Sequence, residues 1–155
     1  MIVFLHHCNG RCQIFFENLL PNRRFGVEIT LSELFPRSTT IIATVKGDIH
    51  DIGKNIVKVL LENYGFYVVD LGRDVDPETV VNASTGAKMV ALSALMTTTV
   101  PQMEETIKLL RKTTPKTKIM VGGAVLTQTY ADMIGADFYG KDAMDAVRIA
   151  QKVFE

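Results

Sequence analysis

The segment TTIIATVKGDIHDIGKNIVKVLLEN, residues 39–63, contains a strand pattern, a polar loop and a helix pattern in direct succession. Residues 39–45 are almost all β-branched or apolar, as in a strand that is buried on both faces. From Ile52 to Leu60 the apolar residues recur at helical spacing. A buried strand that leads through a short loop into a helix predicts the first half of a β–α–β unit.

The same alternation continues to the end of the chain. Further strands are expected at 66–71, 88–95, 118–121 and 136–139, and further helices at 76–86, 100–110, 126–134 and 142–154. Five nearly continuous apolar strands, each followed by a helix, predict a parallel sheet with right-handed crossovers and helices on both faces. This is a doubly wound α/β fold of the flavodoxin-like or Rossmann-like kind.

Residues 1–38 do not share this pattern. They show no clean periodicity, so we expect an irregular leader with at most short helices over 12–20 and 30–35, the second ended by Pro36. The expected division of the chain is therefore a leader at 1–38 and one domain at 39–155.

The composition excludes several classes of protein. Seventeen basic and seventeen acidic residues give a formal charge of zero, which does not favour nucleic acid or an anionic membrane as a partner. Two cysteines, Cys8 and Cys12, cannot form a disulfide framework for a domain of this size. No apolar run approaches the roughly 20 residues that a membrane span needs. We expect a cytoplasmic protein.

Glycine and hydroxyl residues follow four of the five expected strands. Ligands of open parallel sheets bind beyond the carboxyl ends of the strands, at the topological switch point. Small and hydroxyl-bearing residues there let the backbone approach a ligand and hydrogen-bond it. A site spread over this many loops suits a large, elongated ligand. The strand ends concerned are followed by residues 46–55, 93–99, 122–124 and 139–140.

The loop after the first strand carries His50, two residues after Asp48. A histidine that ligates a metal through one ring nitrogen needs an acceptor, often a carboxylate, on the other. One histidine and one carboxylate are too few ligands for a structural zinc site. They suffice for the axial position of a metal whose remaining ligands come from a macrocycle. Taken alone, however, such a histidine is more often a polar surface or capping residue.

The combined pattern resembles the cobalamin-binding domain. The resemblance rests on Asp48-x-His50-x-x-Gly53, Ser93-x-Leu95 and Gly122-Gly123, and it covers roughly residues 39–155. The longer stretch GDIHDIGKN, residues 47–55, is similar to the methyltransferase branch of that family. This branch includes methionine synthase and the corrinoid proteins of methanogens and acetogens.

The resemblance implies that His50 is the lower axial ligand of cobalt, in place of the cofactor's own dimethylbenzimidazole. Asp48 would accept the second ring N–H, and Thr99 stands where methionine synthase has a serine in the same relay. The displaced nucleotide tail would run between the sheet and its helices. The residues expected to bind the cofactor are Asp48, Ile49, His50, Asp51, Gly53, Ser93, Leu95, Thr97, Thr99, Gly122, Gly123, Tyr139 and Gly140.

The function implied is that of a corrinoid carrier protein. It would bind cobalamin base-off and His-on, as methylcobalamin when it carries the methyl group. It would shuttle that group between a methyl-donor and a methyl-acceptor methyltransferase, with a reductive activator as a further candidate partner. No catalytic acid, base or donor pocket is recognisable in the sequence, so we do not expect the chain alone to catalyse turnover.

The chain departs from the methyltransferase branch before residue 39. That branch normally places a helical bundle there, which caps the upper face of the cofactor. Four helices of average length, about 11–12 residues each, do not fit into 38 residues. Either the cap is absent, or residues 1–38 are a truncated or altered remnant of it.

Other functions remain as alternatives or fit less well. A cobalamin-dependent sensor, or the cobalamin-binding part of a mutase, could use the same binding motif. A phospho-receiver needs an aspartate at the end of the third strand, which here ends in Ser93. A zinc site at Cys8 and Cys12, with the neighbouring histidines, has a spacing that fits no compact metal site.

One expectation concerns Asp48 itself. Because the residue lies in a predicted loop, we expect Asp48→Asn to leave folding little affected.

Overall fold

The structure, a computed structural model, describes residues 3–8, 11–16, 25–29 and 39–155. The chain divides into two compact units, residues 1–36 and 37–155. Each unit is considered separately below.

Three strands make up the described residues of the first unit: β1 (Val3–Cys8), β2 (Arg11–Phe16) and β3 (Phe25–Ile29). They pair antiparallel in the order β1-β2-β3. The helix predicted over 12–20 is therefore wrong as far as Phe16, because a short apolar run fits a strand as well as a helix. The helix predicted over 30–35 lies outside the described residues. The described residues of this unit are therefore strands, and the interpretation of residues 1–38 as an altered remnant of a cap stays a prediction.

The second unit is built on a five-stranded, all-parallel sheet. Its strand order is β5-β4-β6-β7-β8, which confirms the predicted doubly wound fold. The winding reverses between β4 and β6, so the switch point lies where these two neighbouring strands end. The strands are β4 (Thr39–Thr44), β5 (Tyr67–Asp70), β6 (Met89–Ser93), β7 (Lys118–Gly122) and β8 (Phe138–Gly140).

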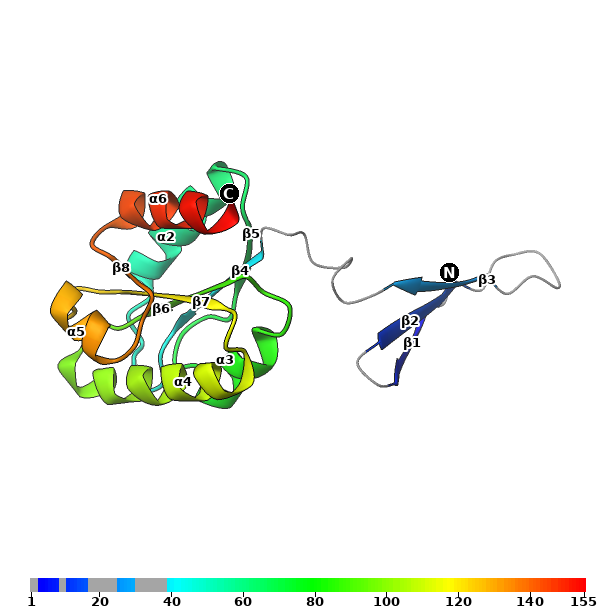
Figure 1. Cartoon of the computed structure of the whole chain (residues 1–155), viewed down its shortest axis with the longest axis horizontal. Coiled ribbons are helices and arrows are strands. Elements are labelled where there is room, and N and C mark those ends of the chain that lie inside the picture. The colour runs from blue at the N-terminus through cyan, green and yellow to red at the C-terminus, as the bar shows by residue number, and fades with distance from the viewer. Residues whose placement is uncertain (1–2, 9–10, 17–24, 30–38) are drawn as a thin grey trace. The chain divides into compact units, whose positions relative to one another are not determined.

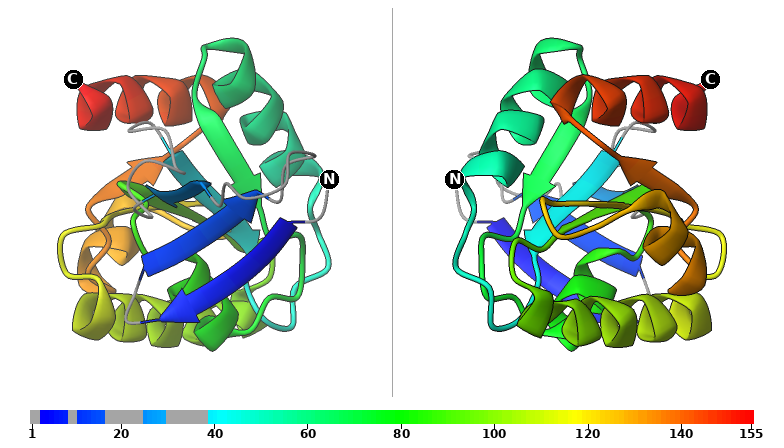
Figure 2. Two further views of the ribbon diagram at one scale, coloured as in Figure 1. Left: turned by 90° about the vertical axis from the view of Figure 1, so that its right-hand side faces the viewer. Right: turned by 90° about the vertical axis from the view of Figure 1, so that its left-hand side faces the viewer.

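Helices cover both faces of this sheet (Figure 1). One face carries α2 (Ile52–Asn63) and α6 (Ala143–Phe154). The other carries α3 (Pro77–Ala83), α4 (Val100–Thr113) and α5 (Gln128–Met133). Figure 2 shows the two layers from the sides, with α6 and α4 on opposite sides of the sheet. None of the described helices is long and apolar enough to cross a membrane.

The central strand β4 explains why the sheet is covered twice. All six of its residues are buried. Ile41 and Ala43 belong to the core under α3 and α4, whereas Ile42 belongs to the core under α2 and α6. A strand with apolar side chains on both faces needs a helical layer on each side, as the nearly continuous apolar run indicated.

Two hydroxyl groups on β4 lack a hydrogen-bond partner among the described residues, namely Oγ1 of Thr40 and Oγ1 of Thr44, and both are buried. Valine has nearly the shape of threonine without the hydroxyl. We therefore expect Thr40→Val to raise the free energy of unfolding by about 1 kcal/mol, because an unpaired buried hydroxyl is removed. Urea unfolding of the cofactor-free protein measures this change.

Thr117 provides the matched control. Its buried Oγ1 donates to the Ala87 carbonyl at 3.1 Å. Thr117→Val should therefore lower the free energy of unfolding, by about 1 kcal/mol. Changes of the same sign at Thr40 and Thr117 would contradict the explanation.

Candidate functional site

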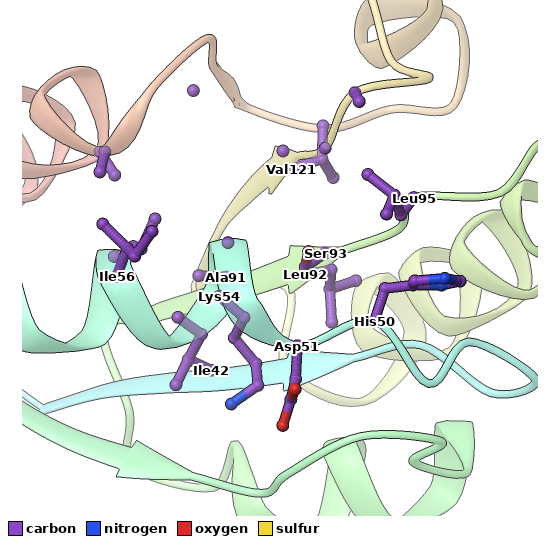
Figure 3. Close-up of a pocket in the computed structure, with 18 of the residues that line it drawn as sticks. Ile42, His50, Asp51, Lys54, Ile56, Ala91, Leu92, Ser93, Leu95 and Val121 are labelled. Carbon is purple, nitrogen blue, oxygen red and sulfur yellow. The ribbon is translucent and has the colours of Figure 1, made fainter.

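A cavity of about 880 Å³ opens at the carboxyl edge of the sheet, at the switch point. Its walls come from the ends of β6, β7 and β8, the loop after β4, and the first turns of α2 and α6. Figure 3 shows Ser93 and Val121 at the ends of β6 and β7, with Ile56 rising from α2. Of the residues expected to bind a cofactor, those that line this cavity are Ile49, His50, Asp51, Gly53, Ser93, Leu95, Gly122, Gly123, Tyr139 and Gly140.

Three expected residues do not line the cavity. Asp48 and Thr99 are buried beside it and contact each other. Thr97 begins the short 3-10 helix η1 (Thr97–Thr99), where its side chain is exposed. Asp48 and Thr99 can therefore act only through other residues.

The His50 ring is held through its Nδ1 atom. Nδ1 lies 2.8 Å from Oδ1 of Asp48, and the backbone N–H of His50 donates to the same oxygen at 3.0 Å. Because a carboxylate can only accept, Nδ1 carries a proton, and in the neutral ring Nε2 then carries the free lone pair. Nε2 has no hydrogen-bond partner among the described residues, and the ring is about half exposed at the cavity. The ring is therefore fixed in the tautomer that a metal ligand needs.

The carboxylate of Asp48 is fully buried and almost completely hydrogen-bonded. Its Oδ2 accepts from the backbone N–H groups of Leu95 and Met96, at 2.6 and 3.2 Å, and from Oγ1 of Thr99 at 3.1 Å. Burial raises the pKa of Asp48, but the hydrogen bonds from His50, Leu95 and Thr99 outweigh it and lower the pKa to about 2. Asp48 is thus an anion at neutral pH and joins the His50 loop to the loop after β6.

The inner part of the cavity is lined by apolar residues, and there is empty space beside a glycine of α2. Ile42, Ala91 and Met120 line it from the sheet. A Cβ atom added to Gly53, in the first turn of α2, would meet no heavy atom within 4 Å. The volume lies in the range of sites for organic ligands, about 300–1,000 Å³. An elongated organic group can therefore enter between α2 and the sheet, beside a histidine that presents one donor nitrogen.

The sequence analysis assigned no role to the basic residues around the cavity. Lys54 lines it, yet its side chain is only 1% exposed and lies 2.7 Å from Oδ1 of Asp70 at the end of β5. Burial raises the pKa of Asp70, but hydrogen bonds from Lys54 and from the Gly72 N–H outweigh this effect, so that the pKa lies below its usual value. A pairing across 16 residues has no local signal. Arg73 and Lys141 also line the cavity, and no sequence pattern singled them out.

Comparison with known proteins shows the family of this chain. A family model of the B12 binding domain matches residues 38–148. The chain is 42% identical over 139 residues to dimethylamine corrinoid protein 1 of Methanosarcina acetivorans, a match that covers 83% of this chain and 65% of the relative. It is 48% identical over 134 residues to trimethylamine corrinoid protein 2 of the same organism, covering 79% of this chain and 61% of the relative. The chain thus spans less than two thirds of the length of these relatives.

A solved structure is similar to this chain in both fold and sequence. It is the methanol:cobalamin methyltransferase complex MtaBC from Methanosarcina barkeri. The match has a TM-score of 0.72 and 38% identity, and it covers 76% of this chain and 46% of that chain. The five-stranded unit described here therefore has a counterpart in a protein of known structure.

The burial of Asp48 reverses the expectation that Asp48→Asn leaves folding little affected. An asparagine amide has one acceptor oxygen, so its NH₂ group must face either the N–H of His50 or those of Leu95 and Met96. We expect the free energy of unfolding of the cofactor-free protein to fall by about 2 kcal/mol at pH 7. Urea unfolding measures it, with Asp51→Asn as the control, because the Asp51 side chain does not cap α2.

The effect should depend on pH in one direction. The pKa of Asp48 is lowered from 3.8 to about 2, so its stabilisation is complete above about pH 4 and is lost as the pH falls through 2. The difference between parent and Asp48→Asn should therefore shrink over this window. A difference that stays constant down to pH 2, or none at pH 7, would contradict the role given to the buried carboxylate.

Proposed function

Because the chain belongs to the B12 binding domain family, we propose that it is a corrinoid carrier, which holds cobalamin and passes a methyl group between two partner enzymes. The observation that carries the proposal is the His50 ring, which lines the cavity, has Nδ1 held by Asp48, and leaves Nε2 without a hydrogen-bond partner among the residues that the structure describes. Cobalamin is the cofactor of this family. When bound, it supplies a cobalt atom that can accept and release a methyl group.

In this proposal His50 would ligate the cobalt of the bound cofactor through Nε2. Asp48 holds the ring in its donor tautomer and, as a buried anion, makes the imidazole a stronger donor. Thr99 and the backbone of Leu95 keep Asp48 in place. The chain would therefore fix the position and the tautomer of one imidazole ring.

The nucleotide tail is proposed to occupy the cavity, which has a volume of about 880 Å³ and a largely apolar lining. Gly53 leaves the wall of α2 open, and Ser93 offers a hydroxyl group at the end of β6. Gly122 and Gly123 let the backbone of β7 pass close to the ligand. At Gly123 this role is also structural, because a Cβ atom there would lie 1.8 Å from the Ala94 carbonyl oxygen. Residues 39–155 are the proposed cofactor-binding unit.

The partners are proposed to be a methyl-donor and a methyl-acceptor methyltransferase, together with a reductive activator, all in the cytoplasm. The similar proteins are corrinoid proteins named for dimethylamine and trimethylamine, and one similar chain lies in a methanol:cobalamin methyltransferase complex. These names favour a small methylated amine or alcohol as the ultimate methyl donor. The cavity has its mouth at the sheet edge, where a partner enzyme can reach the ligand.

Reconstitution tests this function. The protein is loaded with hydroxocobalamin and passed through gel filtration, and it should retain about one corrinoid per chain. The reduced, loaded protein is then mixed with methylamine or methanol methyltransferases and carbon-14 methyl substrates, one donor at a time. We expect label to move to the protein from at least one donor. A protein that stays colourless would overturn cofactor binding, and one that binds corrinoid but takes label from none of the mono-, di- or trimethylamine or methanol enzymes would overturn the carrier function.

Gly53→Leu tests the placement of the tail without disturbing the fold. Leucine is a better helix former than glycine by about 1 kcal/mol, and its Cβ meets no atom of the cofactor-free protein. The melting temperature of the cofactor-free protein should therefore stay equal or rise. Affinity for cobalamin should fall about tenfold or more, because the side chain occupies the space of the tail.

Glu62→Leu is the matched control for Gly53→Leu, since Glu62 is exposed on the same helix and does not line the cavity. It should leave the affinity unchanged. Equal affinities for the parent and Gly53→Leu, measured by equilibrium dialysis, would place the tail elsewhere.

A further inference from the structure

The loop that carries His50, residues 46–51, is held from two sides. On one side the Asp48 carboxylate binds the loop after β6, as described above. On the other side the loop between β5 and α3, residues 71–76, contacts it through backbone and side-chain hydrogen bonds. Val45, just before the first loop, and Val75, near the end of the second, also form an isolated parallel bridge. The second side has no part in the function proposed so far.

Asp74 makes the hydrogen bonds of the second side to Gly47 and Asp48. Its Oδ1 accepts the backbone N–H of Gly47 at 2.8 Å, and its own N–H donates to the Asp48 carbonyl at 3.0 Å. Nζ of Lys46 lies 3.4 Å from the same Oδ1. Asp74 therefore contacts the first three residues of the loop, Lys46, Gly47 and Asp48, through both its backbone and its side chain.

The backbone of Asp74 is in the left-handed region, with φ at 54°. Among the described residues it is the single non-glycine residue with positive φ. Such a conformation is uncommon outside glycine and asparagine-like residues, and it persists where the surrounding structure requires it. Here it lets one residue turn both its N–H and its carboxylate toward the same loop.

Gly47 needs this external contact. Its φ is 82°, and glycine has the widest conformational freedom of any residue. The Gly47 N–H bond to Asp74 also lowers the pKa of the Asp74 carboxyl, with a further contribution from Lys46, so the acceptor is charged at neutral pH. The backbone conformation of Gly47 determines the positions of the residues that follow it, Asp48 and His50.

We infer that Asp74 is a positioning residue for the axial ligand: by holding Gly47 and Asp48 it places the His50 ring where Nε2 can reach cobalt. This inference rests on the proposed function, because it requires His50 to be the ligand. Asp74 touches neither the His50 ring nor the cavity. It acts through the backbone of the loop.

Three substitutions at Asp74 separate the hydrogen bond from the backbone conformation. Asp74→Gly keeps the left-handed conformation and removes the acceptor. Asp74→Asn keeps both the conformation and an acceptor oxygen and removes the charge. Asp74→Ala removes the acceptor and also disfavours the conformation. Asp76→Asn is the matched control, because Asp76 makes the same 3.4 Å contact with Lys46 but no contact with Gly47.

The measurement is the nitrogen superhyperfine splitting of the cobalt(II) form in electron paramagnetic resonance. The protein carries nitrogen-15 histidine and the cobalamin carries natural nitrogen, so the spectrum gives the fraction of bound cofactor with a histidine axial ligand. For Asp74→Gly the ratio of His-on to His-off cofactor should fall roughly fivefold, as expected for one lost hydrogen bond. For Asp74→Ala the same ratio should fall by at least as much. Asp74→Asn should retain the parent ratio to within about twofold, as should Asp76→Asn.

A purely structural role would give a different result. It would lower the melting temperature of the cofactor-free protein while leaving the His-on fraction of the bound cofactor at the parent value. If Asp74→Gly and Asp74→Ala both give that outcome while the parent protein shows histidine coupling, the positioning role of Asp74 is overturned. The proposed function of the chain is then unaffected. A parent spectrum with no histidine coupling overturns the axial role of His50, and the inference with it.

Discussion

The buried carboxylate of Asp48 is the contact on which the site depends. Its two oxygens join the His50 ring to the backbone of Leu95 and Met96, so that the loop after β4 and the loop after β6 are fixed to each other. A buried carboxylate without partners would be protonated or expelled. Here the donors keep it charged, with a pKa of about 2. The same interaction therefore stabilises the switch point and sets the tautomer of the histidine.

The topology makes this contact possible. In the order β5-β4-β6-β7-β8 the first and third strands of the domain are neighbours, so their carboxyl ends lie side by side. The crossover helices α2 and α3 leave on opposite faces of the sheet, and the space at the strand ends stays open. A large cofactor can then use the interior between sheet and helix for its tail and one loop for its metal.

Much of this arrangement could be predicted from the sequence. The alternating strand and helix patterns indicated all five strands of the second unit, and the spacing of Asp48 and His50 indicated their pairing. Contacts between loops could not be predicted, because they depend on how separate crossovers pack. One such contact is the binding of Asp48 by the backbone N–H of Leu95. Another is the contact made by Asp74, which depends on its left-handed backbone. The strands of the first unit were missed because their short apolar runs fit either secondary structure.

The central claim is that His50 replaces the cofactor's own base below cobalt. It is tested most directly by electron paramagnetic resonance of the cobalt(II) form, prepared with natural-abundance and with nitrogen-15 histidine. The account predicts that the label changes the superhyperfine splitting, and that His50→Ala removes the change. An identical spectrum with and without the label would show that the axial nitrogen comes from the cofactor or from solvent components, and would contradict the account.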